Sequence, residues 1–169
     1  LALVNDEVRL RGISLITSSV KRAVGTGLDP RIKSLNYLHS VMARMEATAA
    51  GADEAILLNQ HGFVAECSAE NLFIVRGEAL STPPLSDGAL GGITRETIME
   101  LSTKLSVECR EQSLTTYDLY TADECFICGT GARLIPVRSI DGRGLRTVAG
   151  PLFNRIAEGF RSLIKEECS

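Results

Sequence analysis

Apolar residues recur along the chain with two spacings, one typical of strands and one typical of helices. Short runs rich in β-branched and aromatic residues, bounded by glycine, proline or charge, predict strands. These runs lie at 12–20, 55–58, 63–65, 71–75, 80–82, 107–114, 124–128 and 134–140. Apolar residues three and four positions apart predict helices at 34–50, 94–105 and 151–165, with a short helical turn at 116–119.

The first of these predicted helices is strongly amphipathic. Gly51 follows it and is a suitable C-cap residue. Its apolar positions are Leu35, Leu38, Val41, Met42, Met45 and Ala49.

Strands and helices are mixed along the chain without a strict alternation. This order favours an α+β or irregular α/β domain over a doubly wound parallel sheet. With 169 residues, the chain is long enough for one domain with a core of its own. It begins at Leu1 without a methionine, and its opening residues lead straight into a strand, so we expect a piece of a longer protein.

Composition narrows the range of partners. The net charge is −3 and there is no run of Lys or Arg, which argues against nucleic acid or an anionic membrane as the main partner. No apolar stretch approaches the roughly 20 residues of a membrane-spanning helix, and the start of the chain does not resemble a signal peptide. We therefore expect a soluble, cytoplasmic protein.

The cysteines do not form the pattern of a disulfide framework or a metal site. Their number, five, is odd, and most have apolar neighbours, as expected of reduced and buried thiols. Cys125 and Cys128 form a CxxC motif within one predicted strand, where residues three apart project from opposite faces. No second pair exists to complete four ligands, and only His39 and His61 could add imidazoles, so we expect no metal site.

Lys33 is the first candidate for chemistry. It stands at the start of the first predicted helix, after a loop that contains Gly25, Gly27 and Pro30. An ordinary solvated lysine fits this position. A lysine close to the positive end of a helix dipole could also have a lowered pKa, which a nucleophile that forms an imine requires.

Glu66 is the second candidate, because it closes an apolar strand and precedes a loop of small residues. It either points to water as a strand-end charge or faces inward toward a cationic ring nitrogen. Two glycine-containing segments, 90–95 and 128–133, are either simple turns or sites where backbone N–H groups receive an anion. In the first segment Thr94 is suited to be the N-cap of the second helix.

Taken together, these segments resemble the fold type IV pyridoxal-phosphate enzymes. This group comprises branched-chain aminotransferases, D-amino acid aminotransferases and aminodeoxychorismate lyases. The stretches that carry the resemblance occur in the family's order and cover the chain from about Gly12 onward. They read IKSLNYL, GADEAILLNQHGFVAECSAENLF, STPPL, LGGITR, ADECFICGTG and ARLIPVRSIDG.

The resemblance implies a role for each candidate residue around pyridoxal 5′-phosphate. Lys33 resembles the catalytic lysine, which forms the Schiff base and moves the proton between the substrate and the cofactor. Glu66 resembles the carboxylate that pairs with the ring nitrogen. The other implied cofactor contacts are the backbone donors Ile93 and Thr94 at the phosphate, helped by Thr130, with Leu90 on the ring and Tyr37 at its O3′. Thr130 and Gly131 would receive the substrate carboxylate.

The resemblance also implies a domain arrangement. Family members build the site between two domains, and nothing here corresponds to the small N-terminal domain. We therefore expect residues 1–11 to end the interdomain connection and residues 12–169 to form the large, cofactor-binding domain of the D-amino acid aminotransferase-like fold. Such a piece is expected to lack full activity alone, and its parent is expected to be a homo-oligomer.

The implied reaction is transamination between a small, branched-chain amino acid and 2-oxoglutarate. Two residues depart from the aminotransferase pattern: Cys67, where many members have Gly, and Arg133, where a small or acidic residue is usual. Because Cys67 also resembles some lyases, an aminodeoxychorismate lyase stays open as an alternative. A third possibility is a non-catalytic fragment that acts as an oligomerisation module.

Overall fold

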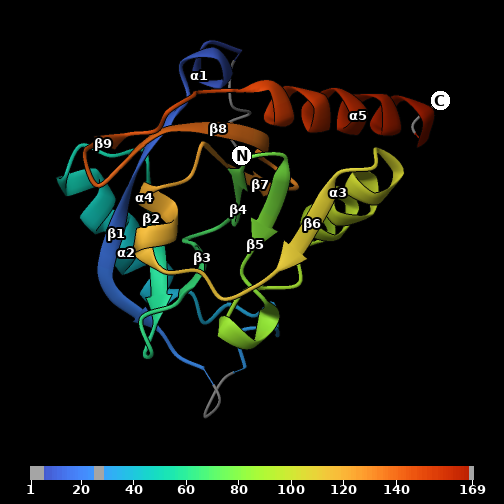
Figure 1. Ribbon diagram of the computed structural model, residues 1–169. Coiled ribbons are helices and arrows are strands. Elements are labelled where there is room, and N and C mark those ends of the chain that lie inside the picture. The colour runs from blue at the N-terminus through green and yellow to red at the C-terminus, as the bar shows by residue number, and fades with distance from the viewer. Residues whose placement is uncertain (1–5, 25–28, 168–169) are drawn as a thin grey trace.

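A curled, mixed sheet forms the centre of the computed structural model, which describes residues 6–24 and 29–167 (Figure 1). Its strands lie in the order β3-β2-β1-β8-β7-β4-β5-β6, and β9 pairs with β8. Strand β1 runs parallel to β2 and β8, and β5 runs parallel to β6, whereas the remaining pairs are antiparallel. This architecture agrees with the predicted irregular α/β class.

The strands match the predicted runs closely. They are β1 (Ile13–Arg22), β2 (Glu54–Asn59), β3 (Val64–Cys67), β4 (Asn71–Arg76), β5 (Ala79–Thr82), β6 (Glu108–Glu111), β7 (Glu124–Gly129), β8 (Arg133–Ile140) and β9 (Arg143–Gly144). The predicted strand at 107–114 is too long, because β6 pairs only with the four residues of β5. The short β9 was not predicted.

The helices are α1 (Asp6–Arg11), α2 (Leu38–Ala49), α3 (Ile93–Lys104), α4 (Thr116–Tyr120) and α5 (Pro151–Glu167), with a 3-10 turn, η1 (Leu85–Asp87). Helix α1 was not predicted. It is tied to the sheet by Arg9, whose guanidinium donates to the carbonyls of Ala132 and Leu134 at 3.2 and 3.0 Å.

Alternate residues of the central strands face different cores. On β4, Leu72 and Ile74 pack on the side that carries α4, whereas Phe73 and Val75 pack on the side covered by α3 and α5. Phe73 stacks on Phe126 of β7 with ring centroids 5.2 Å apart. The CxxC pair obeys the same alternation, because Cys125 lies in the first core and Cys128 in the second. The prediction that these thiols project from opposite faces is confirmed.

Helix α2 packs on the sheet through small residues. Ala43 and Ala47 contact β2, and Ser40 is buried beside them. The large apolar side chains face outward instead: Leu35 and Leu38, which precede and begin the helix, and Val41, Met42 and Met45 within it. The helix also begins at Leu38, four residues later than predicted. Its predicted end is confirmed, since Gly51 follows it with φ of 70°.

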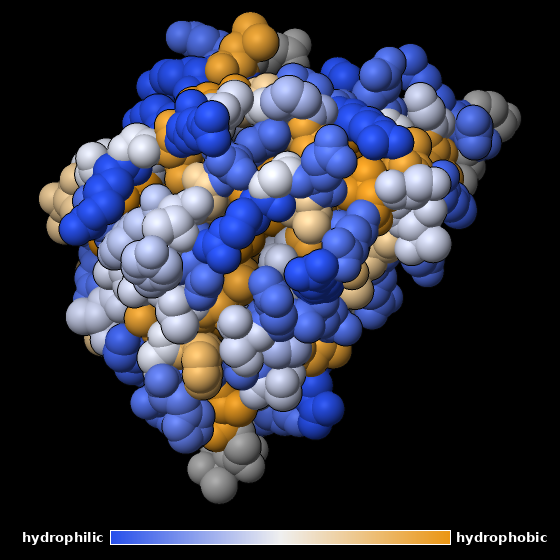
Figure 2. All heavy atoms as spheres, viewed as in Figure 1, coloured by the Kyte–Doolittle hydropathy of each residue, from blue (hydrophilic) through white to orange (hydrophobic). Residues whose placement is uncertain are grey.

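The face of the molecule in Figure 2 has a mixed surface, because apolar and hydrophilic side chains are interspersed over it. Among residues 6–24 and 29–167, no helix has both the length and the apolar character needed to cross a membrane.

A buried glutamate of strand β7 caps the N-terminus of helix α5. The carboxylate of Glu124 accepts hydrogen bonds from the backbone N–H groups of Leu152 and Phe153, at 3.2 and 3.0 Å. This contact satisfies two of the helix's free donors and places a negative charge at the positive end of its dipole. Gly150 makes room for it, because a Cβ there would lie closer than 3.0 Å to the carboxyl group of Glu124.

We therefore predict that Gly150→Ala destabilises the protein by displacing Glu124 from the start of α5. The expected loss is about 1 to 2 kcal/mol in the free energy of unfolding, as for a lost helix cap. Urea denaturation measures it. Gly144→Ala is the matched control, since a Cβ at Gly144 meets nothing within 4 Å. Equal stability of the two variants would contradict the prediction.

Candidate functional site

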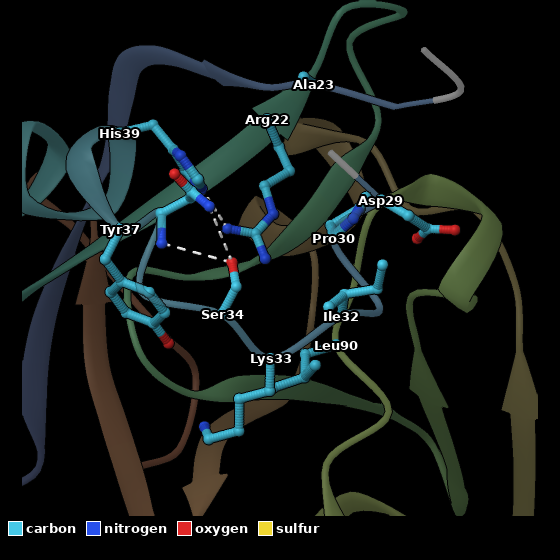
Figure 3. Close-up of a pocket in the computed structure, with 11 residues that line it drawn as sticks. Arg22, Ala23, Asp29, Pro30, Ile32, Lys33, Ser34, Tyr37, His39 and Leu90 are labelled. Atoms are coloured by element: carbon cyan, nitrogen blue, oxygen red, sulfur yellow. Dashed lines mark hydrogen bonds between the residues drawn. The ribbon is translucent and has the colours of Figure 1, made fainter. Parts of the chain in front are cut away.

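Three of the predicted site residues line one cavity of about 280 Å³. Lys33 and Tyr37 reach it from the loop between β1 and α2, and Leu90 reaches it from the loop before α3 (Figure 3). Arg22, at the end of β1, and His39, in the first turn of α2, also line it. The cavity thus combines residues from segments far apart in the sequence.

Lys33 lies in an extended loop and is exposed. The sequence predicted Lys33 at the start of a helix, and this is wrong, because residues 34–37 are not helical. Asp29 shapes this loop by accepting hydrogen bonds from the backbone N–H and the guanidinium of Arg31. The side chains of Lys33 and Tyr37 end on the same side of the cavity (Figure 3). Partial burial, and secondarily the charge of Glu66, raise the pKa of the Tyr37 phenol.

Glu66 is buried, so its interpretation as a strand-end charge in water is wrong. Its Oε1 accepts a hydrogen bond from Arg22 Nη2 at 2.6 Å, and its Oε2 accepts one from the backbone N–H of Leu90 at 2.9 Å. Burial raises the pKa of this carboxyl, while the positive charge of Arg22 and then the Leu90 N–H oppose that rise. Lys33 also acts on it electrostatically, which relates the two candidates to one region.

Arg22 is the partner that the sequence pattern did not identify. It is buried, and its guanidinium donates in three directions: from Nε to the carbonyl of Gly88 at 3.2 Å, from Nη2 to Glu66, and from Nη1 to Nε2 of His39. Gly88 has a φ of 102°, and a Cβ there would lie 3.0 Å from Cγ of Arg22. A glycine is therefore required next to this arginine.

Asn71, the first residue of β4, connects Glu66 to the start of α3. Its amide Nδ2 donates to Oε2 of Glu66 at 3.2 Å and to the carbonyl of Leu90 at 2.9 Å. Its Oδ1 lies against Gly92, where a Cβ would approach closer than 3.0 Å. The sequence analysis did not select Asn71, although an amide at the start of an otherwise apolar strand was a signal for it.

Helix α3 begins with free backbone donors. Its N-cap is Gly92, not Thr94 as predicted, and no side chain caps it. Ile93 and Thr94 are the first two helical residues, and the N–H groups at these positions have no partner within a helix. Ile93 is exposed and Thr94 is buried. Neither lines the Lys33 cavity, but both follow directly on the Leu90–Gly92 segment that contacts Asn71 and Glu66.

Thr130 and Gly131 lie in the turn between β7 and β8, outside the Lys33 cavity. The pairing of Asn71 with Cys128 places this turn beside the start of β4. Gly131 borders a second cavity of about 300 Å³, which Glu54 and Glu70 also line. The structure thus gathers Lys33, Tyr37, Leu90 and Glu66 closely and places the 130–131 turn at the neighbouring strand ends.

The second cavity contains a glutamate with a strongly altered pKa. Glu54 is buried, pairs with Arg44 and accepts a hydrogen bond from Ser68 Oγ at 2.5 Å. Glu70 lies beside it, and burial together with the charge of Glu54 raises the pKa of Glu70 to about 7. Glu70 also packs under the turn, since its Cγ would lie 3.5 Å from a Cβ at Gly129.

Comparisons with known proteins give matches over most of the chain. The family model described as amino-transferase class IV matches residues 2–140. A putative branched-chain-amino-acid aminotransferase of Methanocaldococcus jannaschii is 45% identical over 153 residues, which are 90% of this chain and 53% of that protein. The branched-chain-amino-acid aminotransferase of Escherichia coli K12 is 39% identical over 168 residues, covering 98% of this chain and 54% of the relative.

Solved structures of similar proteins have the same fold. The crystal structure of the Escherichia coli enzyme superposes with a TM-score of 0.88 at 41% identity, over 90% of this chain and 52% of that one. The Thermobaculum terrenum branched-chain enzyme in its PLP form gives a TM-score of 0.88 at 36% identity, over 90% and 51%. The predicted fold class is confirmed. The chain spans about half the length of the relatives it matches.

The raised pKa of Glu70 predicts a pH-dependent stability. The folded chain holds the proton of the Glu70 carboxyl more tightly than the unfolded chain does. The stability gained in this way is fully present below the ordinary glutamate pKa of 4.5 and is lost as pH rises to about 7. Glu70→Gln has no carboxyl to ionise at this position and so avoids this loss of stability at high pH. We expect urea denaturation at pH 8 to give a variant more stable than the native protein by roughly 1 to 3 kcal/mol, with a smaller difference at pH 5.

The matched control for this measurement is Glu78→Gln, at an exposed position in the turn after β4. Its difference from the native protein should not change with pH. If the Glu70→Gln variant keeps the native dependence on pH, the prediction is wrong.

Proposed function

The chain belongs to the class IV aminotransferase family, and from this premise we propose that it is the cofactor-binding part of a pyridoxal 5′-phosphate-dependent branched-chain aminotransferase. The observation that carries the proposal is the buried Glu66 carboxylate, fixed by Arg22 and the Leu90 N–H within electrostatic reach of Lys33. A ligand that fits here has two different ends. One end carries a positive charge and pairs with the buried carboxylate, and the other reacts with the lysine amine.

The residues present fit this cofactor. Lys33 would bond it covalently, and Glu66 would face its ring nitrogen. The uncapped start of α3 offers the N–H groups of Ile93 and Thr94 to a phosphate, which the helix dipole also favours. Leu90 would pack on the ring, Tyr37 would reach its O3′, and Thr130 would assist at the phosphate from the neighbouring turn.

Bound pyridoxal phosphate supplies an electron sink for the substrate's Cα–H bond. The chain's own residues do the rest. Glu66 keeps a negative charge at the ring nitrogen, which raises the pKa of that nitrogen and keeps it protonated. The Lys33 amine would move the proton from the substrate's Cα to the cofactor's C4′. The Gly131 N–H, with Thr130, would receive the substrate carboxylate.

We further propose that the substrates are a small, branched-chain amino acid and 2-oxoglutarate in a ping-pong reaction. The named functions of the relatives support this choice. An aminodeoxychorismate lyase stays the alternative, because Cys67, which resembles some lyases at the position after Glu66, is compatible with either reaction from its buried place in the core. Keto-acid formation from leucine, measured against pyruvate release from aminodeoxychorismate, separates the two reactions.

The domain arrangement is part of the proposal. Residues 1–11 would end an interdomain connection, 12–169 would form the large domain, and an N-terminal domain of the parent protein would complete the substrate pocket. The 169-residue chain alone would then have reduced activity. A non-catalytic oligomerisation module, the other alternative, would take up no cofactor even with that domain restored. The cytoplasmic location stays a prediction.

We also propose that the protein is a homo-oligomer, with α2 at the contact. The large apolar side chains of α2 remain outside the core, with Leu38 73% and Met45 66% exposed. Exposed apolar residues gathered on one helix face are typical of an interface. A second copy, packed helix to helix, would remove them from water.

The first test of this proposal is Lys33→Ala. The near-visible absorption band of the covalent lysine–cofactor bond should appear when the parent protein is mixed with pyridoxal phosphate and should be lost in this variant. Transamination activity should fall by a factor of about 10³ or more, because the nucleophile and the proton carrier are one group. Lys104→Ala, at the exposed end of α3, should keep both. A band that persists without Lys33 would sink the assignment.

The second test is Met42→Glu, which places a charge on the apolar face of α2. Analytical ultracentrifugation should give an oligomer for the native protein and at least tenfold weaker association for the variant, because burying an unpaired charge is costly. Tyr117→Glu changes a side chain that is 71% exposed on α4 and serves as the control. A monomeric native protein would refute the α2 contact.

A further inference from the structure

His39 contacts the buried arginine of the site from the opposite side to Glu66. Its Nε2 meets Nη1 of Arg22, while Nη2 of the same guanidinium donates to Glu66 at 2.6 Å. The three side chains come from α2, β1 and β3, so the contact joins separate elements. Figure 3 shows the imidazole directed at the guanidinium.

The chemistry of this contact fixes the protonation state of His39. An arginine has only donors, so Nε2 must be the acceptor, and the ring must be neutral with its proton on Nδ1. Partial burial and the charge of Arg22 both lower the pKa of His39, which agrees with a neutral ring. Arg22 is the charged group in contact with His39. Glu66 lies beyond Arg22, and Lys33 and Tyr37 line the same cavity.

A neutral acceptor at this point sets the direction of the guanidinium. Gly88 and Glu66 accept from Nε and Nη2, and His39 accepts from Nη1, so each of the three guanidinium nitrogens has a partner. A buried guanidinium that loses one partner either pays a desolvation cost or rotates to find another. The cavity on the Lys33 side is the space into which it would rotate.

We propose that His39 is a positioning residue that acts through Arg22 to hold the Glu66 carboxylate in place for the cofactor's ring nitrogen. This inference deepens the proposed function and rests on it for the role of Glu66. The arrangement of His39, Arg22 and Glu66 can be tested without any cofactor, so the two proposals can fail separately.

The first experiment observes His39 directly. The chain has two histidines, so long-range ¹H–¹⁵N spectra of the ¹⁵N-histidine-labelled chain contain two imidazole patterns, and His61→Gln assigns them. We expect His39 to be neutral with the proton on Nδ1, and its pKa to rise in Arg22→Met. A proton on Nε2 at neutral pH overturns the proposal, because that nitrogen could not accept from Arg22.

The second experiment measures the effect on Glu66. His39→Leu keeps most of the volume and removes the acceptor, whereas His39→Gln keeps an acceptor oxygen near the position of Nε2. The side-chain ¹³C signal of Glu66, titrated in the cofactor-free chain, should move to a higher pKa by about one unit in His39→Leu, because Arg22 leaves the carboxylate. In His39→Gln the native pKa should be retained.

Two further outcomes complete the test. If His39→Leu leaves the Glu66 titration unchanged, the inference is wrong, whatever the cofactor does. With pyridoxal phosphate labelled at the ring nitrogen, His39→Leu should shift the ¹⁵N signal toward the unprotonated ring, and His39→Gln should restore it. Failure of the native protein to take up pyridoxal phosphate would refute the proposed function, while the Glu66 titration would still decide whether His39 positions the carboxylate.

Discussion

The structure around the site depends on keeping one carboxylate charged without water. Moving an isolated carboxylate into a protein interior costs several kcal/mol unless opposite charge and hydrogen bonds offset it. For Glu66 these are supplied by Arg22 at the end of β1, by the Leu90 N–H before α3, and by Asn71 at the start of β4. Three segments separated in the sequence must therefore converge on one side chain. Strands β3, β1 and β4 are the first, third and sixth in the sheet, so the sheet must curl for their ends to meet at this side chain.

The same requirement explains two glycines that are otherwise easily read as mere turn residues. Gly88 adopts a left-handed conformation and leaves space for the stem of Arg22, and Gly92 leaves space for the amide of Asn71. A side chain at either position would displace a group that holds Glu66. Gly88 and Gly92 are thus needed to hold the carboxylate, while the start of α3 beside them has no side-chain cap and can receive an anion.

The sequence predicted the strands well because a short run of β-branched and aromatic residues, bounded by glycine, proline or charge, is a local signal. The candidate site was predicted less completely. Lys33, Glu66 and Leu90 stood in recognisable segments, but Arg22 follows Lys21 in a polar strand end, and nothing local distinguishes the buried cation from the exposed one. The same holds for His39, whereas Asn71 had a local signal, as an amide at the start of an otherwise apolar strand. Helix α2 illustrates the limit of periodicity: its spacing identifies an apolar face, but small residues pack on the sheet and the large ones face outward.

Strand β3 shows why even a correct strand prediction does not fix which way a candidate site residue points. Val64 and Cys67 lie three residues apart, yet both contact the same core, which strict alternation forbids. The register with β2 explains this, because Leu57 pairs with Glu66 and Leu58 with Val64, so Ala65 is an extra, bulged residue. The bulge changes the parity of the strand. Without it, Glu66 and Val64 would face the same side, and either the carboxylate would enter the apolar core or Val64 would leave it. One inserted residue therefore lets Glu66 face away from the core in which Val64 and Cys67 pack.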